Sequence, residues 1–118
     1  MLALRGATTF DEDTKAEIDA KTQALVREML ERNSVGHDDL VSIIFTATDD
    51  LTAEFPATAA RALGLGDVPL LCARELGIVH GMRRTIRVLM HFYGEQARGD
   101  LHHVYLEGAR SLRDDLPE

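Results

Sequence analysis

The segment Thr85-Ile-Arg-Val-Leu-Met-His-Phe92 alternates apolar side chains with more polar ones along its length. A period of two residues is the period of a β-strand, in which successive side chains point to opposite faces. One face would carry Ile86, Val88, Met90 and Phe92, and the other would carry Thr85, Arg87, Leu89 and His91. The pattern therefore predicts a strand with one buried face, and it places Arg87 on the opposite face.

Four other segments predict strands around this one. Residues 2–9 alternate loosely and end in threonines, whereas residues 41–48 are a β-branched, nearly continuous apolar run that is typical of a central strand. Residues 68–72 predict a short strand, which Pro69 restricts to a sheet edge or to a strand start. Residues 103–106 predict the last strand.

Two helices are predicted between the strands. Residues 14–32 begin with Thr14 and Glu17 at the spacing of a capping box, and they continue with apolar residues at helical intervals. A short helix is predicted from Pro56, which suits the first helical position, to the residue before Gly64, which suits the position after the last. Several strands with one long and one short helix make an α+β fold with a mixed β-sheet.

Composition narrows the class of function. A chain of 118 residues without a linker-like interior stretch predicts a single domain over residues 1–118. The net charge of −7 disfavours nucleic acid and anionic membranes as partners, and no apolar run of about 18 residues could cross a membrane. Cys72 is the single cysteine, which fits a cytoplasmic protein, and the five histidines lack metal-site spacing. Because small chains often build their pockets between subunits, we also expect an oligomer.

Six segments, taken in order, resemble the AroH-class chorismate mutases. They are Arg5-Gly6-Ala7-Thr8-Thr9, Thr46-Ala47-Thr48-Asp49-Asp50-Leu51, Phe55-Pro56-Ala57, Val68-Pro69-Leu70-Leu71-Cys72, Arg87-Val88-Leu89-Met90 and His103-Val104-Tyr105-Leu106-Glu107. The resemblance covers nearly the whole chain. It implies a homotrimer of α+β subunits around a pseudo-barrel of sheets, with active sites between adjacent subunits. It also implies conversion of chorismate to prephenate without a cofactor or a metal.

The resemblance assigns catalytic roles that suit this chemistry. Chorismate is a dianion that rearranges by a pericyclic shift, so catalysis requires a compact conformer and stabilisation of charge on the departing ether oxygen. By resemblance, Arg87 donates to that oxygen. Glu75 resembles the acceptor for the ring hydroxyl, with the Cys72 thiol beside it. Arg5 and Tyr105 resemble the residues that bind a substrate carboxylate.

Further residues match positions that line the site. Phe55, Ala57 and Arg61 resemble the residues that a family member contributes to the site of the neighbouring subunit. Weaker matches are Leu71 and Leu112, which would line the pocket, and Arg113, which would cover its entrance. The chain departs from the pattern at Thr58, where some family members have a lysine, and this departure predicts weaker substrate binding.

Each of these residues also has an ordinary structural interpretation when it is taken alone. Arg5, Arg61 and Arg87 could be solvated surface arginines. Tyr105 could be a half-buried aromatic residue of a strand, and Phe55 could make a hydrophobic contact at the start of a helix. Cys72 could be a small residue of the core. Fold alone does not secure function. The alternatives are a trimeric small-ligand-binding protein without catalysis, an imine deaminase similar to the Rid proteins, a thiol protease and a purely structural protein.

Overall fold

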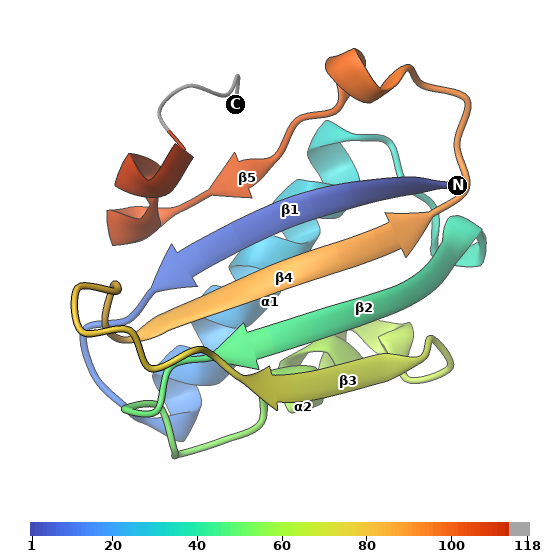
Figure 1. The fold of residues 1–118 in the computed structure, drawn as a ribbon. Coiled ribbons are helices and arrows are strands. Elements are labelled where there is room, and N and C mark those ends of the chain that lie inside the picture. The colour runs from blue at the N-terminus through green and yellow to red at the C-terminus, as the bar shows by residue number, and fades with distance from the viewer. Residues whose placement is uncertain (114–118) are drawn as a thin grey trace.

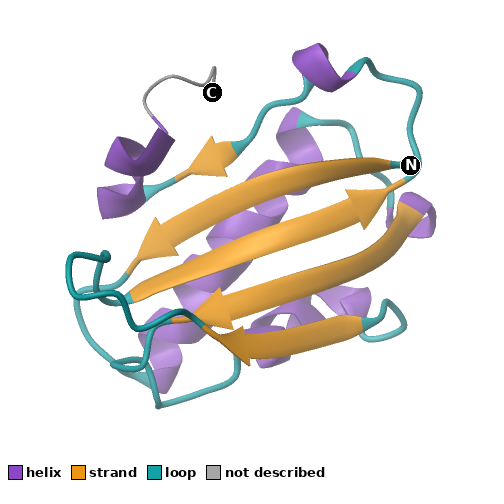
Figure 2. Ribbon diagram, in the orientation of Figure 1, coloured by secondary structure: helices purple, strands orange, loops and turns teal. Residues whose placement is uncertain are grey.

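A computed structural model of the chain describes residues 1–113, which form a five-stranded sheet with helices against one face (Figure 1, Figure 2). The elements are β1 (Leu2–Thr9), α1 (Lys15–Arg32), β2 (Leu40–Ala47), α2 (Pro56–Ala60), β3 (Leu70–Arg74), β4 (Thr85–Phe92) and β5 (Val104–Tyr105), with short helical turns η1 (His37–Asp39), η2 (Arg61–Leu65), η3 (Arg98–Asp100) and η4 (Glu107–Arg113). This architecture confirms the α+β prediction. None of the helices in the described residues has the length and hydropathy that crossing a bilayer requires.

The sheet has the strand order β3-β2-β4-β1-β5. The predicted strand over residues 85–92 is β4, which lies at the centre and pairs antiparallel with both β1 and β2. The edge position predicted from Pro69 is confirmed, but β3 begins two residues later than predicted. The reason is that the Val68 amide donates to the Leu65 carbonyl in a turn, and Pro69 has no amide hydrogen. The ladder with β2 therefore starts at Leu70.

The long helix begins at the predicted N-cap. The Thr14 side chain accepts a hydrogen bond from the Glu17 amide at 3.2 Å. The other half of the expected capping box is different, because the Glu17 carboxylate accepts from the amides of Asp11 and Glu12 at 2.6 and 3.2 Å. The cap of α1 therefore also holds the loop that leads out of β1.

The short helix begins at Pro56, as predicted, and continues into the wider turn η2. Gly64 has φ of 89°, a left-handed conformation that glycine adopts without steric strain, and it interrupts the helical geometry just before η2 ends at Leu65. The α2–η2 segment lies on the same side of the sheet as α1, next to β3 (Figure 1).

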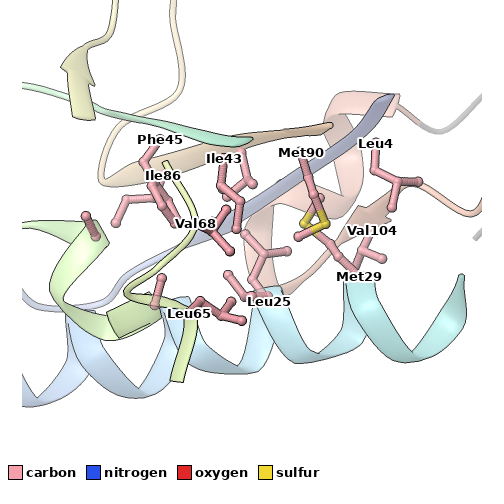
Figure 3. Packing of buried hydrophobic residues seen from close by; sticks show 14 of the residues in the cluster. Leu4, Leu25, Met29, Ile43, Phe45, Leu65, Val68, Ile86, Met90 and Val104 are labelled. Carbon is pink, nitrogen blue, oxygen red and sulfur yellow. The ribbon is translucent and has the colours of Figure 1, made fainter. Parts of the chain in front are cut away.

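The main core fills the space between the sheet and α1 (Figure 3). Leu25 and Met29 of α1 are fully buried against Ile43 and Met90 of the sheet. Gly6 permits this close approach, since a Cβ atom there would lie 2.6 Å from the Met29 sulfur. The glycine of the Arg5-Gly6-Ala7 motif therefore has a packing role, and its two neighbours point to the other face of β1.

The face of the sheet away from α1 and α2, which we call the open face, is partly covered at one end. A second apolar cluster joins Ala7, Tyr105 and Ala109, with Leu112 packed against it. The sequence of residues 112–118 is typical of a loosely ordered tail, but Leu112 and Arg113 belong to η4 and Leu112 packs on this cluster. The rest of this segment lies outside the described residues.

Candidate active site

Strand register places residues of four strands in one line across the open face, and three of these residues are polar. Arg87 of β4 lies directly opposite Thr46 of β2 and Ala7 of β1. Ala7 in turn lies opposite Tyr105 of β5. Because directly opposed residues share a face, these side chains line one row of the sheet, in which the small Ala7 separates Arg87 from Tyr105.

A neighbouring row carries two more of the predicted residues. Leu89, two positions beyond Arg87 on β4, lies opposite Arg5 of β1 and Ile44 of β2. Ile44 lies opposite Leu71 of β3. Arg5 and Leu71 are both exposed, and the Arg5 amide donates to the His103 ring at 3.0 Å. The structure therefore brings these residues to the same face as Arg87.

Glu75 and Arg87 form an ion pair at the end of β3. The Glu75 amide donates to the Ala47 carbonyl at 2.9 Å, which extends the line of β3 by one residue. Its Oε1 lies 3.0 Å from Arg87 Nε, while its Oε2 accepts a hydrogen bond from the Thr46 hydroxyl. The Nε atom is buried and makes this ion pair without a hydrogen bond of good geometry, and within residues 1–113 neither Nη1 nor Nη2 of Arg87 makes a hydrogen bond. The tip of this guanidinium is therefore available to an anion.

This pair borders a small cleft of about 180 Å³, which is lined by Arg83 among other residues. Arg83 lies 3.5 Å from Asp49 and 3.3 Å from Asp50, so its charge is already balanced. Burial raises the pKa of Asp50, but the Thr48 hydroxyl and the Arg84 amide donate to its carboxylate and hold the pKa below its ordinary value. The adjacent Arg83 charge acts in the same direction. Arg87 is therefore the cation of this cleft whose tip makes no hydrogen bond within the described residues.

A second group of predicted residues lies at α2, away from the open face. Phe55 is 67% exposed, and it borders a cleft of about 420 Å³ together with Cys72. Ala57 is buried at the start of α2. Arg61 is exposed, and its Nη2 donates to the Thr58 hydroxyl at 3.2 Å.

The Cys72 side chain belongs to this second group. Cys72 lies opposite Phe45 in the parallel ladder and packs against the main core, so its thiol is on the helix-covered face. Glu75, three residues further, is on the open face with Arg87. Within one chain, the structure does not bring the thiol beside the Glu75 carboxylate.

Thr46 and Ala7 are site residues that inspection of the sequence did not single out. Both lie within the motifs of the resemblance, but their places beside Arg87 depend on pairing between distant strands. The signal for Thr46 was one of two hydroxyl groups, the other being that of Ser42, within an otherwise apolar strand. Arg113 lies in η4, and Leu112 is half-buried on the open face.

Comparison with known proteins gives consistent matches over almost the full chain. Residues 1–116 match the family described as chorismate mutase type I. The chain is 44% identical to chorismate mutase AroH of Thermus thermophilus over 114 residues, which are 96% of this chain and 93% of that protein. It is 40% identical to chorismate mutase AroH of Bacillus subtilis (strain 168) over 114 residues, 96% of this chain and 90% of that protein. A solved chorismate mutase from Clostridium thermocellum superimposes with a TM-score of 0.92 and 45% identity, covering 94% of this chain and 99% of that one.

Proposed function

This chain belongs to the chorismate mutase type I family, and on that premise we propose that it rearranges chorismate to prephenate on the open face of its sheet. The enzyme is an isomerase that acts on chorismate. The observation that carries the proposed site is the Glu75–Arg87 pair, in which Glu75 Oε1 lies 3.0 Å from Arg87 Nε and the tip of the guanidinium makes no hydrogen bond within residues 1–113. This pair places the positive charge of Arg87 next to the Glu75 carboxylate, which can accept a hydrogen bond.

Arg87 is the group that stabilises the transition state in this proposal. The rearrangement breaks a C–O bond while it forms a C–C bond, and negative charge grows on the ether oxygen. A preorganised donor aimed at such an oxygen typically contributes about 2.7–4 kcal/mol. Glu75 holds the guanidinium in place and accepts a hydrogen bond from the ring hydroxyl of the substrate. No nucleophile, proton transfer or cofactor is needed for a pericyclic step.

Arg5 and Tyr105 bind the substrate carboxylates. Tyr105 is separated from Arg87 by one strand, which corresponds to about 10 Å across the sheet. Arg5 lies in the neighbouring row, opposite Leu89. This spacing suits a compact dianion that spans from Arg87 toward Tyr105, with Leu71 and Leu112 as apolar walls.

A second copy of the chain completes the site. The cleft at Arg87 measures about 180 Å³, whereas pockets for small molecules usually measure about 300–1,000 Å³. The Phe55 ring and the Arg61 side chain are exposed, and Arg61 has no anionic partner within the described residues. We therefore assign them, with Ala57, to the site of a neighbouring subunit in a homotrimer. We place this trimer in the cytoplasm, where a lone thiol such as that of Cys72 stays reduced and where it would serve aromatic amino acid biosynthesis.

The direct test is the loss of chorismate absorbance on adding the purified protein in buffer treated with a chelator. Acid treatment of the product should yield phenylpyruvate, which identifies prephenate. Heat-denatured protein gives the uncatalysed rate, and light scattering on the same sample gives the oligomeric state. Binding of chorismate without any loss of absorbance would instead favour a ligand-binding protein that keeps the fold.

A further inference from the structure

We propose that Thr46 is a positioning residue, whose hydroxyl orients Glu75 so that Glu75 in turn holds Arg87 by its Nε atom. The proposal rests on the proposed function of the open face. Its observation is a three-member chain of contacts, in which the Thr46 hydroxyl donates to Glu75 Oε2 and Glu75 Oε1 lies 3.0 Å from Arg87 Nε.

The backbone fixes Thr46 more firmly than it fixes Glu75. Thr46 lies within β2, directly opposite Arg87 on one side and Ala73 of β3 on the other. Threonine branches at Cβ, so the direction of its hydroxyl follows closely from the strand. Glu75 lies just beyond the end of β3 and has a long side chain with several rotatable bonds. An anchored hydroxyl therefore sets the position of a flexible carboxylate.

The two oxygens of Glu75 are divided between two partners. Because Oε2 is engaged by Thr46, the carboxylate meets Arg87 at Nε and leaves Nη1 and Nη2 to the substrate. Without the hydroxyl, the carboxylate would be free to rotate toward the tip of the guanidinium. A bidentate contact there would occupy the nitrogens that the reacting oxygen needs. Thr46 therefore protects the donor atoms of Arg87.

The hydroxyl group is not needed for the strand itself. Valine has the shape of threonine and is equally favourable in a β-strand, so Thr46→Val should keep the fold. Ser42, on the same strand and face, provides a matched control, because its hydroxyl contacts the His91 ring at 3.1 Å and makes no contact with Glu75. Comparison of the two variants therefore separates the effect of losing any hydroxyl from β2 from the effect of losing the contact with Glu75.

The experiment compares steady-state kinetics of Thr46→Val, Thr46→Ser and Ser42→Ala. We expect Thr46→Val to lower kcat about tenfold, the scale of one hydrogen bond to a charged group, while KM changes much less. Thr46→Ser should recover most of the lost kcat, and Ser42→Ala should match the wild type. Equal activity of the Thr46→Val and wild-type enzymes would overturn the proposal.

A double-mutant cycle tests whether Thr46 acts through Glu75. In a Glu75→Ala background, Thr46→Val should cause no further loss, because the carboxylate that it orients is gone. A tenfold loss that persists in this background would show a structural role and overturn the proposal. The wild-type assay distinguishes a failure of the proposed function from a failure of the proposed role of Thr46. A wild type that does not consume chorismate contradicts the proposed function, whereas an active wild type with an equally active Thr46→Val contradicts only the role of Thr46.

Discussion

The open face and the α2 segment divide the proposed site into two unlike halves. The open-face group is Arg5, Glu75, Arg87 and Tyr105, which come from neighbouring strands at a register set by backbone hydrogen bonds. The α2 group is Phe55, Ala57 and Arg61. These residues belong to a short helical segment that lies next to β3, on the face of the sheet that α1 covers. The first group is held in fixed positions within one chain. The second exposes its aromatic ring and its charge to solvent.

The difference in rigidity predicts a difference in kinetic role. A donor held by strand pairing and by an ion pair needs no reorganisation during the reaction, so changes to it should lower kcat. A side chain on an exposed helical segment can wall the pocket and attract a carboxylate, so changes to it should mainly raise KM. The two halves can therefore be separated by kinetics.

The largest effect is expected for Arg87→Met, which keeps much of the length of the side chain and removes its charge. We expect kcat to fall about 100- to 1,000-fold, the usual result of removing one preorganised donor to a developing oxyanion. Circular dichroism and light scattering should show an unchanged fold and assembly. Near-normal turnover by this variant would exclude an electrostatic role for Arg87.

Arg61→Ala should have a smaller effect of a different kind. We expect KM for chorismate to rise about tenfold with little change in kcat, since an exposed guanidinium that meets a carboxylate contributes mainly to binding. Initial rates over a range of chorismate concentrations measure both constants. A selective fall in kcat would contradict the division of roles between the two groups.

Mixing these two variants tests whether the halves come from different chains. Neither variant alone has an intact site, but a mixed trimer can pair an intact open face with an intact α2 segment of its neighbour. With random assembly after joint refolding, about a quarter of the sites should be intact, and the rate at low substrate should approach a quarter of the wild-type rate. Activity equal to the mean of the separate variants would place both halves of the site within one chain.

Sequence patterns predicted one half of the site better than the other. The period of two in residues 85–92 was sufficient to place Arg87 opposite the buried face, because that period depends only on local backbone geometry. The same parity also separates Cys72 from Glu75, since side chains three residues apart on an extended strand point to opposite faces. Pairing of Thr46 with Arg87 could not be predicted, because register between strands depends on the packing of the whole sheet.

Thr58→Lys should strengthen the binding of chorismate by the α2 group. At present the Thr58 hydroxyl accepts a hydrogen bond from Arg61, at 3.2 Å. A lysine there would release Arg61 and add a second cation beside it, so we expect KM to fall about threefold with unchanged kcat, and more so at low salt. Thr58→Val removes the hydroxyl without adding charge and is the matched control. An unchanged KM in Thr58→Lys would contradict the inference that this chain binds substrate weakly because it lacks that cation.

The smallest effect concerns Asp13, which holds the loop before α2. Its carboxylate accepts hydrogen bonds from the Ala53 amide and from the hydroxyl and amide of Thr52, at 2.8–3.0 Å. These donors, the Ala53 amide foremost, lower the pKa of Asp13 below its ordinary value of 3.8. A lowered pKa means that the folded state favours the charged carboxylate. The resulting stability is present above the ordinary pKa and is lost as pH falls through the lowered value.

Asp13→Asn should therefore lower the melting temperature by a few degrees at pH 7, and the difference from wild type should shrink as the wild-type carboxylate becomes protonated in acid. Thermal unfolding at neutral pH and at about pH 2.5 measures both differences. Glu28→Gln removes a carboxylate from a half-buried pair with Arg32 on the surface of α1 and should change little at either pH. Because Asp13 fixes the loop that leads to Phe55, its loss should also raise KM slightly and leave kcat unchanged. An equal difference at both pH values would show that the charge of Asp13 does not hold this loop, and the α2 half would then owe its position to packing against α1 and the sheet.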